Sequence, residues 1–435
     1  MTGRHSLGLF TLICLVVANM IGAGVFTTSG YAMADLGDPI LVLCAWLAGG
    51  ILAVCGAMSY GALARLRPLS GGEYLYLSRN IHPLAGFIAG WISLVAGFTG
   101  AIAAAALGLE VYLLPLLPVD ALPENVLATL AICLVALLHG RQVGQGALVQ
   151  NGVVILKLVL IVGFIVIGGL IIGLHKVALS GLPENPTGIS AFSLSAFAVT
   201  LMWVSFSYSG FNAATYIAGE ARDPVSTVPR AMLIATVIVM ALYLLLNAFF
   251  VLAPEAETIA GRGDVAAVAA AYLGGDALAG LVRAIIILAL ATSVSAMIMA
   301  GPRVYARMAD DGLLPRCLGL RESAAPGLAT ALQALLAIVV VWISSLRELL
   351  SYLGMTLSIS AAVTVGSLFI LVKRTPGSGA SLPGYPWAPM IYVSFTLLFV
   401  ALAALRTPVQ MLAALLTILS GVAVYLLLNR RRESV

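Results

Sequence analysis

Long apolar segments recur along nearly the whole chain, and they limit its fold more than any other feature. A helix that spans a membrane needs about 20 consecutive apolar residues, and twelve segments approach or exceed this length. They cover approximately residues 8–33, 39–64, 83–117, 124–139, 149–174, 192–219, 228–253, 266–300, 327–345, 348–372, 387–406 and 408–429. The polar stretches between them are too short for a soluble domain. We therefore predict an all-α polytopic membrane protein with a single transmembrane domain.

The composition excludes several other classes of protein. Of the 435 residues, 61% are hydrophobic and 9% are charged, whereas soluble globular chains carry about 25% charged residues. The net charge of +4 gives no indication of a nucleic-acid partner. The five cysteines lack metal-ligand spacing, and the apolar segments hold no acidic or histidine cluster suited to catalysis. We predict no metal, no cofactor and no enzymatic activity.

The placement of basic residues predicts the orientation in the lipid bilayer. With both termini in the cytoplasm, most lysines and arginines fall on the cytoplasmic side, as the positive-inside rule requires. The exceptions are Lys176, Arg262, Arg283, Arg347 and Arg406 on the outer side and Lys157 inside the fifth segment. Short tails and loops favour a bacterial plasma membrane, that is, the inner membrane.

Two glycines one residue apart lie in the middle of the first apolar segment. The stretch Ala18–Phe26 contains Gly22 and Gly24, and glycine tolerates backbone conformations that other residues resist. Non-helical backbone at membrane depth is tolerated only where it is buried in protein or lines a cavity. The stretch therefore indicates a broken helix whose backbone forms a binding site. The alternative is that these glycines only allow close helix packing.

A second candidate break lies in the middle of the sixth segment, within residues 206–215. If the first five and the next five segments are repeats, at about 8–174 and 192–372 with extra helices at about 387–429, the two breaks correspond. Such paired interruptions are typical of transporter sites. An opened helix offers free N–H groups to a carboxylate and free C=O groups to an ammonium. A zwitterion such as an amino acid would satisfy both.

These stretches carry a resemblance to a known family. Ile21–Phe26 resembles the G-S/A-G-I/V-F motif of the amino acid–polyamine–organocation superfamily, and Phe206–Asn212 resembles the F-A-Y-G-G-W-N stretch of its L-type amino acid transporters. Gly219–Pro224, Leu69–Tyr76 and Pro302–Pro315 resemble further motifs of the superfamily. The resemblance covers nearly the whole chain and implies a five-plus-five inverted repeat followed by two additional helices. It does not identify a substrate.

In the first helix, the resemblance implies that the carbonyls of Met20 and Ile21 face the substrate ammonium. The amides of Ala23 and Gly24 would face its carboxylate, across the opening at Gly22. Ala23 replaces the serine of other members, so one hydroxyl contact to the carboxylate is missing.

In the sixth helix, the resemblance implies that the carbonyls of Phe206 and Ser209 also face the ammonium, beside the opening at Gly210. Phe206 matches the aromatic residue that closes over the substrate; without the motif, it would be an ordinary core or lipid-facing residue. Asn212 is expected to hydrogen-bond the opened backbone or the substrate side chain. Phe211 replaces the tryptophan of the L-type group.

Lys157 lies well inside the fifth segment. A lysine at bilayer depth costs about 2.5–3.5 kcal/mol on insertion scales and usually faces the bundle interior; the alternative is that its long side chain reaches the interface. In sodium-independent members of the family, a lysine here occupies the place of a sodium ion. The resemblance thus implies a tether from Lys157 to the opened first helix and to the eighth helix, with Ser293 and Ser295 as candidate neighbours.

Together these features predict a secondary transporter that moves a small neutral amino acid by alternating access without sodium. No second acidic or basic side chain is clearly placed in the pocket, which favours a neutral substrate. The transporter would be an exchanger or a proton-coupled carrier. The alternatives are an amino acid exporter, a cationic amino acid or polyamine transporter, and a membrane amino acid sensor. The loop at about 116–124 has no cysteine, so we expect no disulfide-linked partner chain of the kind found with animal L-type transporters.

Overall fold

The computed structural model describes residues 7–117, 123–141, 147–175, 181, 193–310, 312, 314, 327–375, 377, 379 and 382–433. Across these residues the chain is helical and contains no strand, apart from an isolated bridge between Leu7 and Ala221. Of the sequence features discussed above, Lys176, residues 118–122 of the loop at 116–124, and residues 311, 313 and 315 of the Pro302–Pro315 motif lie outside the described residues.

The helices follow the apolar segments closely. Their bounds are α1 (Leu9–Met20), α2 (Ala23–Leu36), α3 (Pro39–Leu66), α4 (Gly72–Asn80), α5 (Pro83–Ile92), α6 (Ala101–Leu113), α7 (Val126–Arg141), α8 (Ala147–His175), α9 (Leu194–Tyr208), α10 (Pro224–Leu252), α11 (Ala256–Ile259), α12 (Val265–Asp310), α13 (Gly327–Ile343), α14 (Leu346–Arg374), α15 (Trp387–Arg406) and α16 (Pro408–Glu433). Among the described residues, ten stretches are long and apolar enough to cross a membrane, and α7 and α13 contain two shorter apolar helices.

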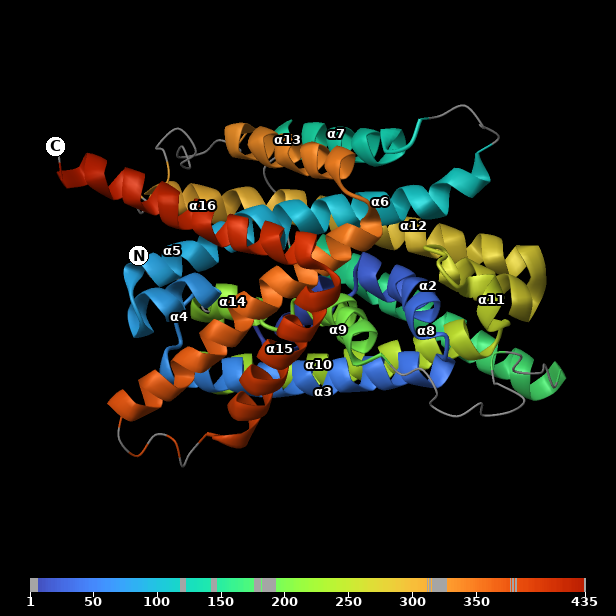
Figure 1. Cartoon of the computed structure of the whole chain (residues 1–435), viewed down its shortest axis with the longest axis horizontal. Helices are drawn as coiled ribbons and strands as arrows, with labels where there is room; N and C mark the ends of the chain where they lie inside the picture. The colour runs from blue at the N-terminus through green and yellow to red at the C-terminus, as the bar shows by residue number, and fades with distance from the viewer. Residues whose placement is uncertain are drawn as a thin grey trace.

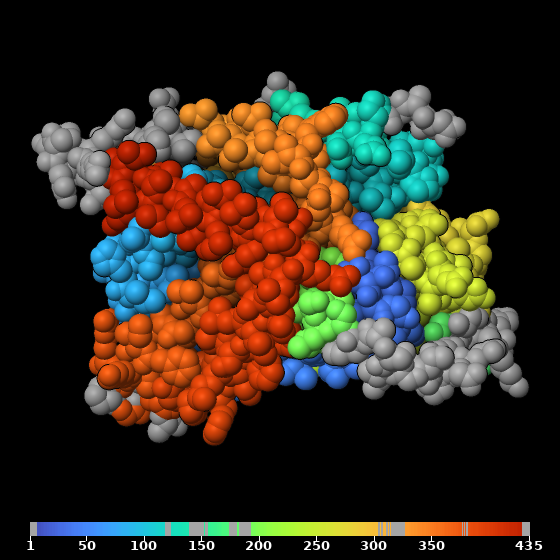
Figure 2. Space-filling view, in the orientation of Figure 1, coloured from blue at the N-terminus to red at the C-terminus, as the bar shows by residue number. Residues whose placement is uncertain are grey.

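Three pairs of helices from the two halves of the chain pack along each other. They are α3 with α10, α6 with α12, and α7 with α13. In Figure 1, α7 and α13 form one edge of the molecule, α3 and α10 form the opposite edge, and α2 and α9 lie between them. The C-terminal helices α14–α16, orange to red in Figure 2, cover much of the face shown. The broken first and sixth helices are therefore held in the middle of the bundle.

Both breaks lie where the glycine-rich stretches predict them. The first helix ends at Met20 and resumes at Ala23, with the N-cap residue Gly22 in an extended conformation (φ −133°, ψ −158°). The sixth helix ends at Tyr208, and a 3₁₀ helix, η3 (Ala213–Glu220), continues the chain.

The third segment, predicted at 83–117, forms one span, Pro83–Leu116, but its helix is irregular. A π-helical turn, η1 (Ser93–Gly100), separates α5 from α6, and a short 3₁₀ turn, η2 (Leu114–Leu116), ends the span. Such π-helical stretches widen the helix and frequently lie at functional sites. Here η1 supplies part of the wall of the central cavity described below.

Backbone pairing joins the start of the first helix to the end of the sixth. The Leu7 amide donates to the Glu220 carbonyl at 3.2 Å, and the Arg222 amide donates to the Leu7 carbonyl at 3.2 Å. These two bonds form the bridge between Leu7 and Ala221.

Candidate functional site

The two broken helices contact each other at their breaks. Gly210 adopts a left-handed φ of +98°, which a residue with a side chain rarely adopts, and a Cβ on it would lie 2.7 Å from the Asn19 carbonyl oxygen. On the other side of the contact, a Cβ on Gly24 would collide with the Ser207 side chain. The glycines thus permit a close approach of the two backbones as well as the break itself.

The breaks leave backbone polar groups without partners in their own helices. The first N–H groups of α2 have no intrahelical acceptor, and no side chain caps that end of the helix. Ala23 and Gly24, which carry the first two of these amides, both line a cavity. Backbone N–H groups at a helix N-terminus favour a negatively charged group.

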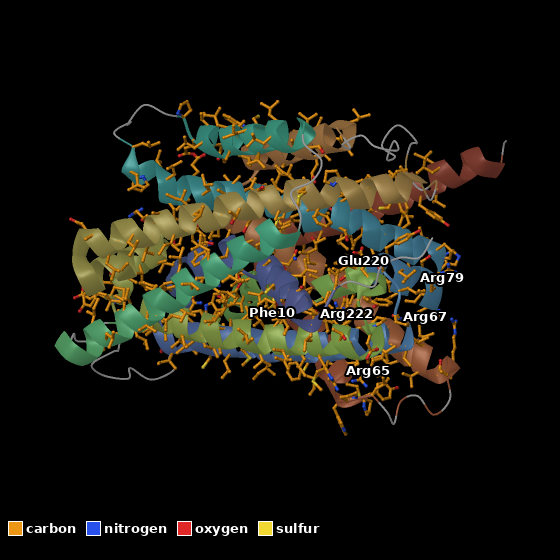
Figure 3. The ribbon with its side chains drawn as sticks, turned by 180° about the vertical axis from the view of Figure 1, so that it is seen from behind. Phe10, Arg65, Arg67, Arg79, Glu220 and Arg222 are labelled. Atoms are coloured by element: carbon orange, nitrogen blue, oxygen red, sulfur yellow. The ribbon has the colours of Figure 1, made fainter. Side chains whose placement is uncertain are left out.

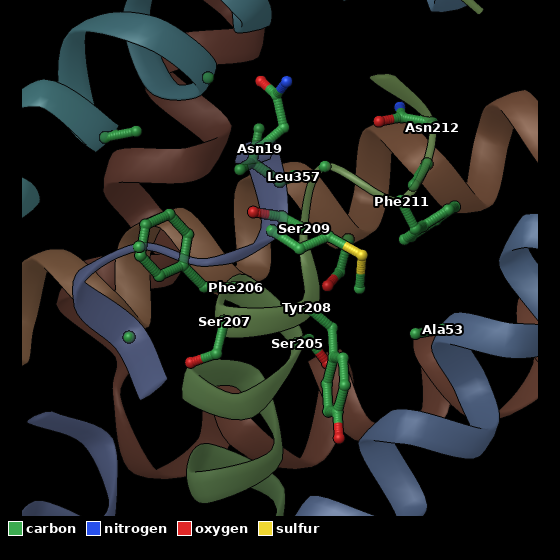
Figure 4. Close-up of a pocket in the computed structure, with 18 of the residues that line it drawn as sticks. Asn19, Ala53, Ser205, Phe206, Ser207, Tyr208, Ser209, Phe211, Asn212 and Leu357 are labelled. Atoms are coloured by element: carbon green, nitrogen blue, oxygen red, sulfur yellow. The ribbon is translucent and has the colours of Figure 1, made fainter. Parts of the chain in front are cut away.

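The cavity has a volume of about 160 Å³ and lies where the two breaks meet (Figure 4). Pockets for drug-sized ligands are larger, at about 300–1,000 Å³, so this one suits a small solute. In Figure 4, Phe206 and Phe211 project to opposite sides of the opened sixth helix. Of the residues predicted to bind substrate, the lining includes Met20, Gly22, Ala23, Gly24, Phe206, Ser209, Gly210, Phe211 and Asn212. Ile21 is not among the lining residues.

Some of the predicted acceptor carbonyls are already hydrogen-bonded. The Tyr243 hydroxyl lies 2.6 Å from the Met20 carbonyl oxygen and 3.1 Å from that of Ser207, so it bridges the two breaks. The Phe206 carbonyl accepts from the Ser209 amide at 2.9 Å. A carbonyl oxygen has two lone pairs, so each of these groups keeps one acceptor site.

Lys157 lies on α8 and reaches the break in the first helix. Its Nζ atom donates to the Ile21 carbonyl oxygen at 3.2 Å and to Ser293 Oγ, on α12, at 3.3 Å. The lysine side chain is 7% exposed. Ser295 lies two residues further along α12, so it stands about 200° around the helix from Ser293, on the opposite face.

The structure also places an acidic side chain in the cavity wall, which the sequence-based prediction missed. Glu73, at the start of α4, is 7% exposed and lines the cavity. Its Oε1 atom accepts from the Tyr60 hydroxyl and, at 3.2 Å, from Asn212 Nδ2; its Oε2 atom accepts from Ser360 Oγ at 2.7 Å. The prediction that no further acidic side chain lies in the pocket is therefore wrong. The sequence did offer one signal for this side chain: the charged residue Glu73 directly follows Gly71 and Gly72, shortly before the third apolar segment.

A second and larger cavity, of about 810 Å³, adjoins the first. Asn19, Ser93, Phe98 and Tyr216 line both cavities. The larger cavity extends along the first half of the first helix and along η3, and its lining includes Glu220. Figure 3 shows Glu220 at the end of the molecule that carries Arg65, Arg67, Arg79 and Arg222.

A group of side chains joins α2, α9 and α14. Asp35, at the end of α2, forms an ion pair with Arg347, at the start of α14. The Arg347 guanidinium carbon lies 5.3 Å from the centre of the Trp203 ring, and Trp203 Nε1 donates to Ser351 Oγ at 2.6 Å. The Tyr31 ring packs edge-on against Trp203. These contacts join α2, α9 and α14 beyond the cavity.

Known proteins with similar sequences are amino acid transporters. The sequence is 26% identical to the serine/threonine exchanger SteT of Bacillus subtilis (strain 168), over 99% of this chain and 98% of that protein. It is 28% identical to the large neutral amino acids transporter small subunit 2 of Homo sapiens, over 98% of this chain and 80% of that protein. It is 24% identical to the Asc-type amino acid transporter 1 of Mus musculus, over 98% of this chain and 81% of that protein.

A family model described as amino acid permease matches residues 7–427. This match spans both helix breaks, the lysine on α8 and the glutamate of the cavity wall. The proteins it groups are transporters and not enzymes. The chain belongs to the amino acid permease family.

Proposed function

We propose that this protein is a sodium-independent secondary transporter that moves a small neutral amino acid across the plasma membrane by alternating access. The observation that carries the proposal is the contact between two broken helices at a cavity of about 160 Å³. The names of two relatives, a serine/threonine exchanger and a large neutral amino acids transporter, agree with a neutral substrate and with exchange.

The opened backbone suits both charges of the substrate. The amides of Ala23 and Gly24 bind the carboxylate, because they are unpaired at a helix N-terminus. The remaining acceptor sites of the Met20, Phe206 and Ser209 carbonyls bind the ammonium. The Ile21 carbonyl adds to the negative electrostatic potential at the ammonium. Phe206 covers the bound amino acid.

A neutral side chain fits the rest of the cavity. Part of its wall is formed by Gly97, Ala101 and Gly354, which leave space because their side chains are small or absent. Glu73 is the acidic group in the wall, but Tyr60, Asn212 and Ser360 hold its oxygens. Three of the about four acceptor sites of the carboxylate are thus already used, and the two relatives named above are described for neutral amino acids. A cationic amino acid or a polyamine is therefore the weaker alternative.

Lys157 supplies a fixed cation at the first break. Its contacts to Ile21 and Ser293 join α8, the opened first helix and α12. A metal ion placed among the same groups would meet a like charge. This supports sodium-independent transport.

The architecture we propose has twelve membrane helices, with α7 and α13 as the two shorter spans. Repeat one comprises residues 8–174, repeat two comprises 192–372, and 387–429 forms the additional pair. The packing of α3 with α10, α6 with α12 and α7 with α13 supports this division, because each pair joins the corresponding helices of the two repeats. The arginine-rich end shown in Figure 3 is then cytoplasmic, both termini are cytoplasmic, and the larger cavity opens inward.

Uptake of labelled L-serine into proteoliposomes in sodium-free buffer tests the function. We expect faster uptake into vesicles loaded with unlabelled serine than into empty vesicles, and competition by other small neutral amino acids. Preferential competition by arginine or a polyamine would favour the cationic alternative. Saturable binding without uptake would favour an amino acid sensor, and a strict sodium requirement would contradict the role of Lys157.

A further inference from the structure

Glu73 has no basic partner in the part of the chain that the structure describes. Its hydrogen bonds come from Tyr60 on α3, from Asn212 at the sixth-helix break and from Ser360 on α14. The other titratable groups that face it are Tyr216 on η3 and Tyr392 on α15, both neutral phenols. An ionised carboxylate in this position is stabilised by neutral hydrogen-bond donors and by the N-terminus of its own helix, α4.

Two opposing effects therefore determine whether the Glu73 carboxyl is ionised. Burial raises the pKa of the Glu73 carboxyl above its ordinary value, and the hydrogen bonds donated by Tyr60 and Ser360 act in the opposite direction. The carboxyl also lines the central cavity, which shares Ser93, Phe98 and Tyr216 with the larger one. Water in these cavities can bring a proton to the carboxyl and take it away.

The three donors respond differently when Glu73 is protonated. A hydroxyl can donate or accept, so Tyr60 and Ser360 can each turn to accept from a Glu73 O–H group. The Nδ2 group of Asn212 can only donate. A hydrogen bond to a charged acceptor is about twice as strong as one between neutral groups. Protonation thus weakens the hydrogen bond that Asn212, at the break of the sixth helix, donates to Glu73.

We propose that Glu73 is a proton-binding site that couples the movement of the sixth-helix break to proton transfer, so that one proton enters together with the amino acid. A proton from the outer solution adds to a carboxylate oxygen and forms an O–H bond. The same bond breaks when the larger cavity opens, and the proton passes to water inside. The carboxylate is regenerated in each cycle, and the Asn212 link is weak in the loaded form and strong in the empty form.

This inference rests on the proposed transport function, and the experiment separates the two. Wild-type protein and the variant E73Q are reconstituted, and uptake of labelled L-serine is measured with and without an inward proton gradient at zero membrane potential. Exchange into serine-loaded vesicles without a gradient reports the proposed function. The ratio of uptake into empty vesicles with the gradient to uptake without it reports proton coupling.

We expect a ratio clearly above one for the wild type and a ratio of one for E73Q, whatever the absolute rate of that variant. E110Q is the matched control. Glu110 is 9% exposed, and its carboxyl is likewise held by neutral donors, the Asn125 and Ala128 amides, but it does not line either cavity. Its ratio should equal that of the wild type.

A second variant keeps the test informative if E73Q does not fold. S360A removes one donor to the carboxylate and leaves the carboxyl in place. Since a hydrogen bond to a charged group favours the charged form, its loss should move the pH midpoint of stimulation upward by about one unit. A wild-type ratio of one, a retained ratio in E73Q, or an unmoved midpoint in S360A would overturn the inference. Absence of exchange in the wild type would instead overturn the proposed function.

Discussion

Gly210 lies directly against the backbone of Asn19, with a left-handed φ of +98° and no space for a side chain. This contact joins the break of the sixth helix to the end of α1. The two breaks are therefore in direct backbone contact, and a change in the conformation of either helix must be accommodated by the other.

Replacing Gly210 by alanine should strongly impair the protein. An alanine in a left-handed conformation costs about 1–2 kcal/mol, and its methyl group would also meet the Asn19 carbonyl. We expect a lower unfolding temperature in detergent and loss of serine exchange. G163A on α8 is the control, because a Cβ there meets nothing within 4 Å and alanine is the better helix former. Equal behaviour of the two variants would show that the contact is unimportant.

The link from Lys157 to the first break can be tested with a double-mutant cycle. K157M should reduce exchange about tenfold or more, because a hydrogen bond from a charged group contributes about 1.5–3 kcal/mol. S293A should have a smaller effect in the wild type and none in the K157M background, since the shared contact is already absent. Additive effects on the exchange rate would mean that Ser293 acts independently of the lysine.

The Tyr243 hydroxyl should stabilise both breaks at once. Y243F removes the group that lies 2.6 Å from the Met20 carbonyl and 3.1 Å from the Ser207 carbonyl. Buried acceptors that lose their donor cost about 1–3 kcal/mol, so the unfolding temperature should fall measurably. Y425F is the comparison, because the Tyr425 ring packs on Phe87 and its hydroxyl makes no hydrogen bond within the described part of the chain. An unchanged unfolding temperature in Y243F would contradict the bridging role.

In the proposed orientation and mechanism, the ion pair between Asp35 and Arg347 should stabilise the form that is closed to the outside. The Arg347 side chain is 45% exposed, and exposed ion pairs contribute about 0–1 kcal/mol. D35N should therefore change the ratio of closed to open molecules by no more than about fivefold. Labelling of S205C by an impermeant thiol reagent from outside, in a background without the native cysteines, would measure this change. The exchanged pair D35R/R347D should return the labelling rate toward that of the parent. Faster labelling in the exchanged pair than in D35N would rule out the attraction as the cause.

The sequence was most informative where a local pattern had a direct backbone consequence. Gly22 and Gly24 lie in an apolar stretch that cannot break in lipid without a reason, and the structure has its break at this position. Lys157 was similarly conspicuous, because a single charge in a long apolar segment needs a partner inside the bundle. Their roles in substrate binding and coupling remain predictions.

The environment of Glu73 could not be found in this way. Its partners Tyr60, Asn212 and Ser360 are separated from it by 13, 139 and 287 residues. No periodicity connects these positions, since tertiary packing alone brings them together. The π-helical stretch at Ser93–Gly100 was also missed, because its sequence carries no pattern that is specific to a π-helix.

The bridge between Leu7 and Ala221 has a consequence for the order of events in transport. It joins the residue before α1 to the end of η3 through the two backbone hydrogen bonds of Leu7, and these bonds would have to break for one half-helix to move without the other. In the proposed cycle we therefore expect access at the arginine-rich end to open by the joint movement of both half-helices.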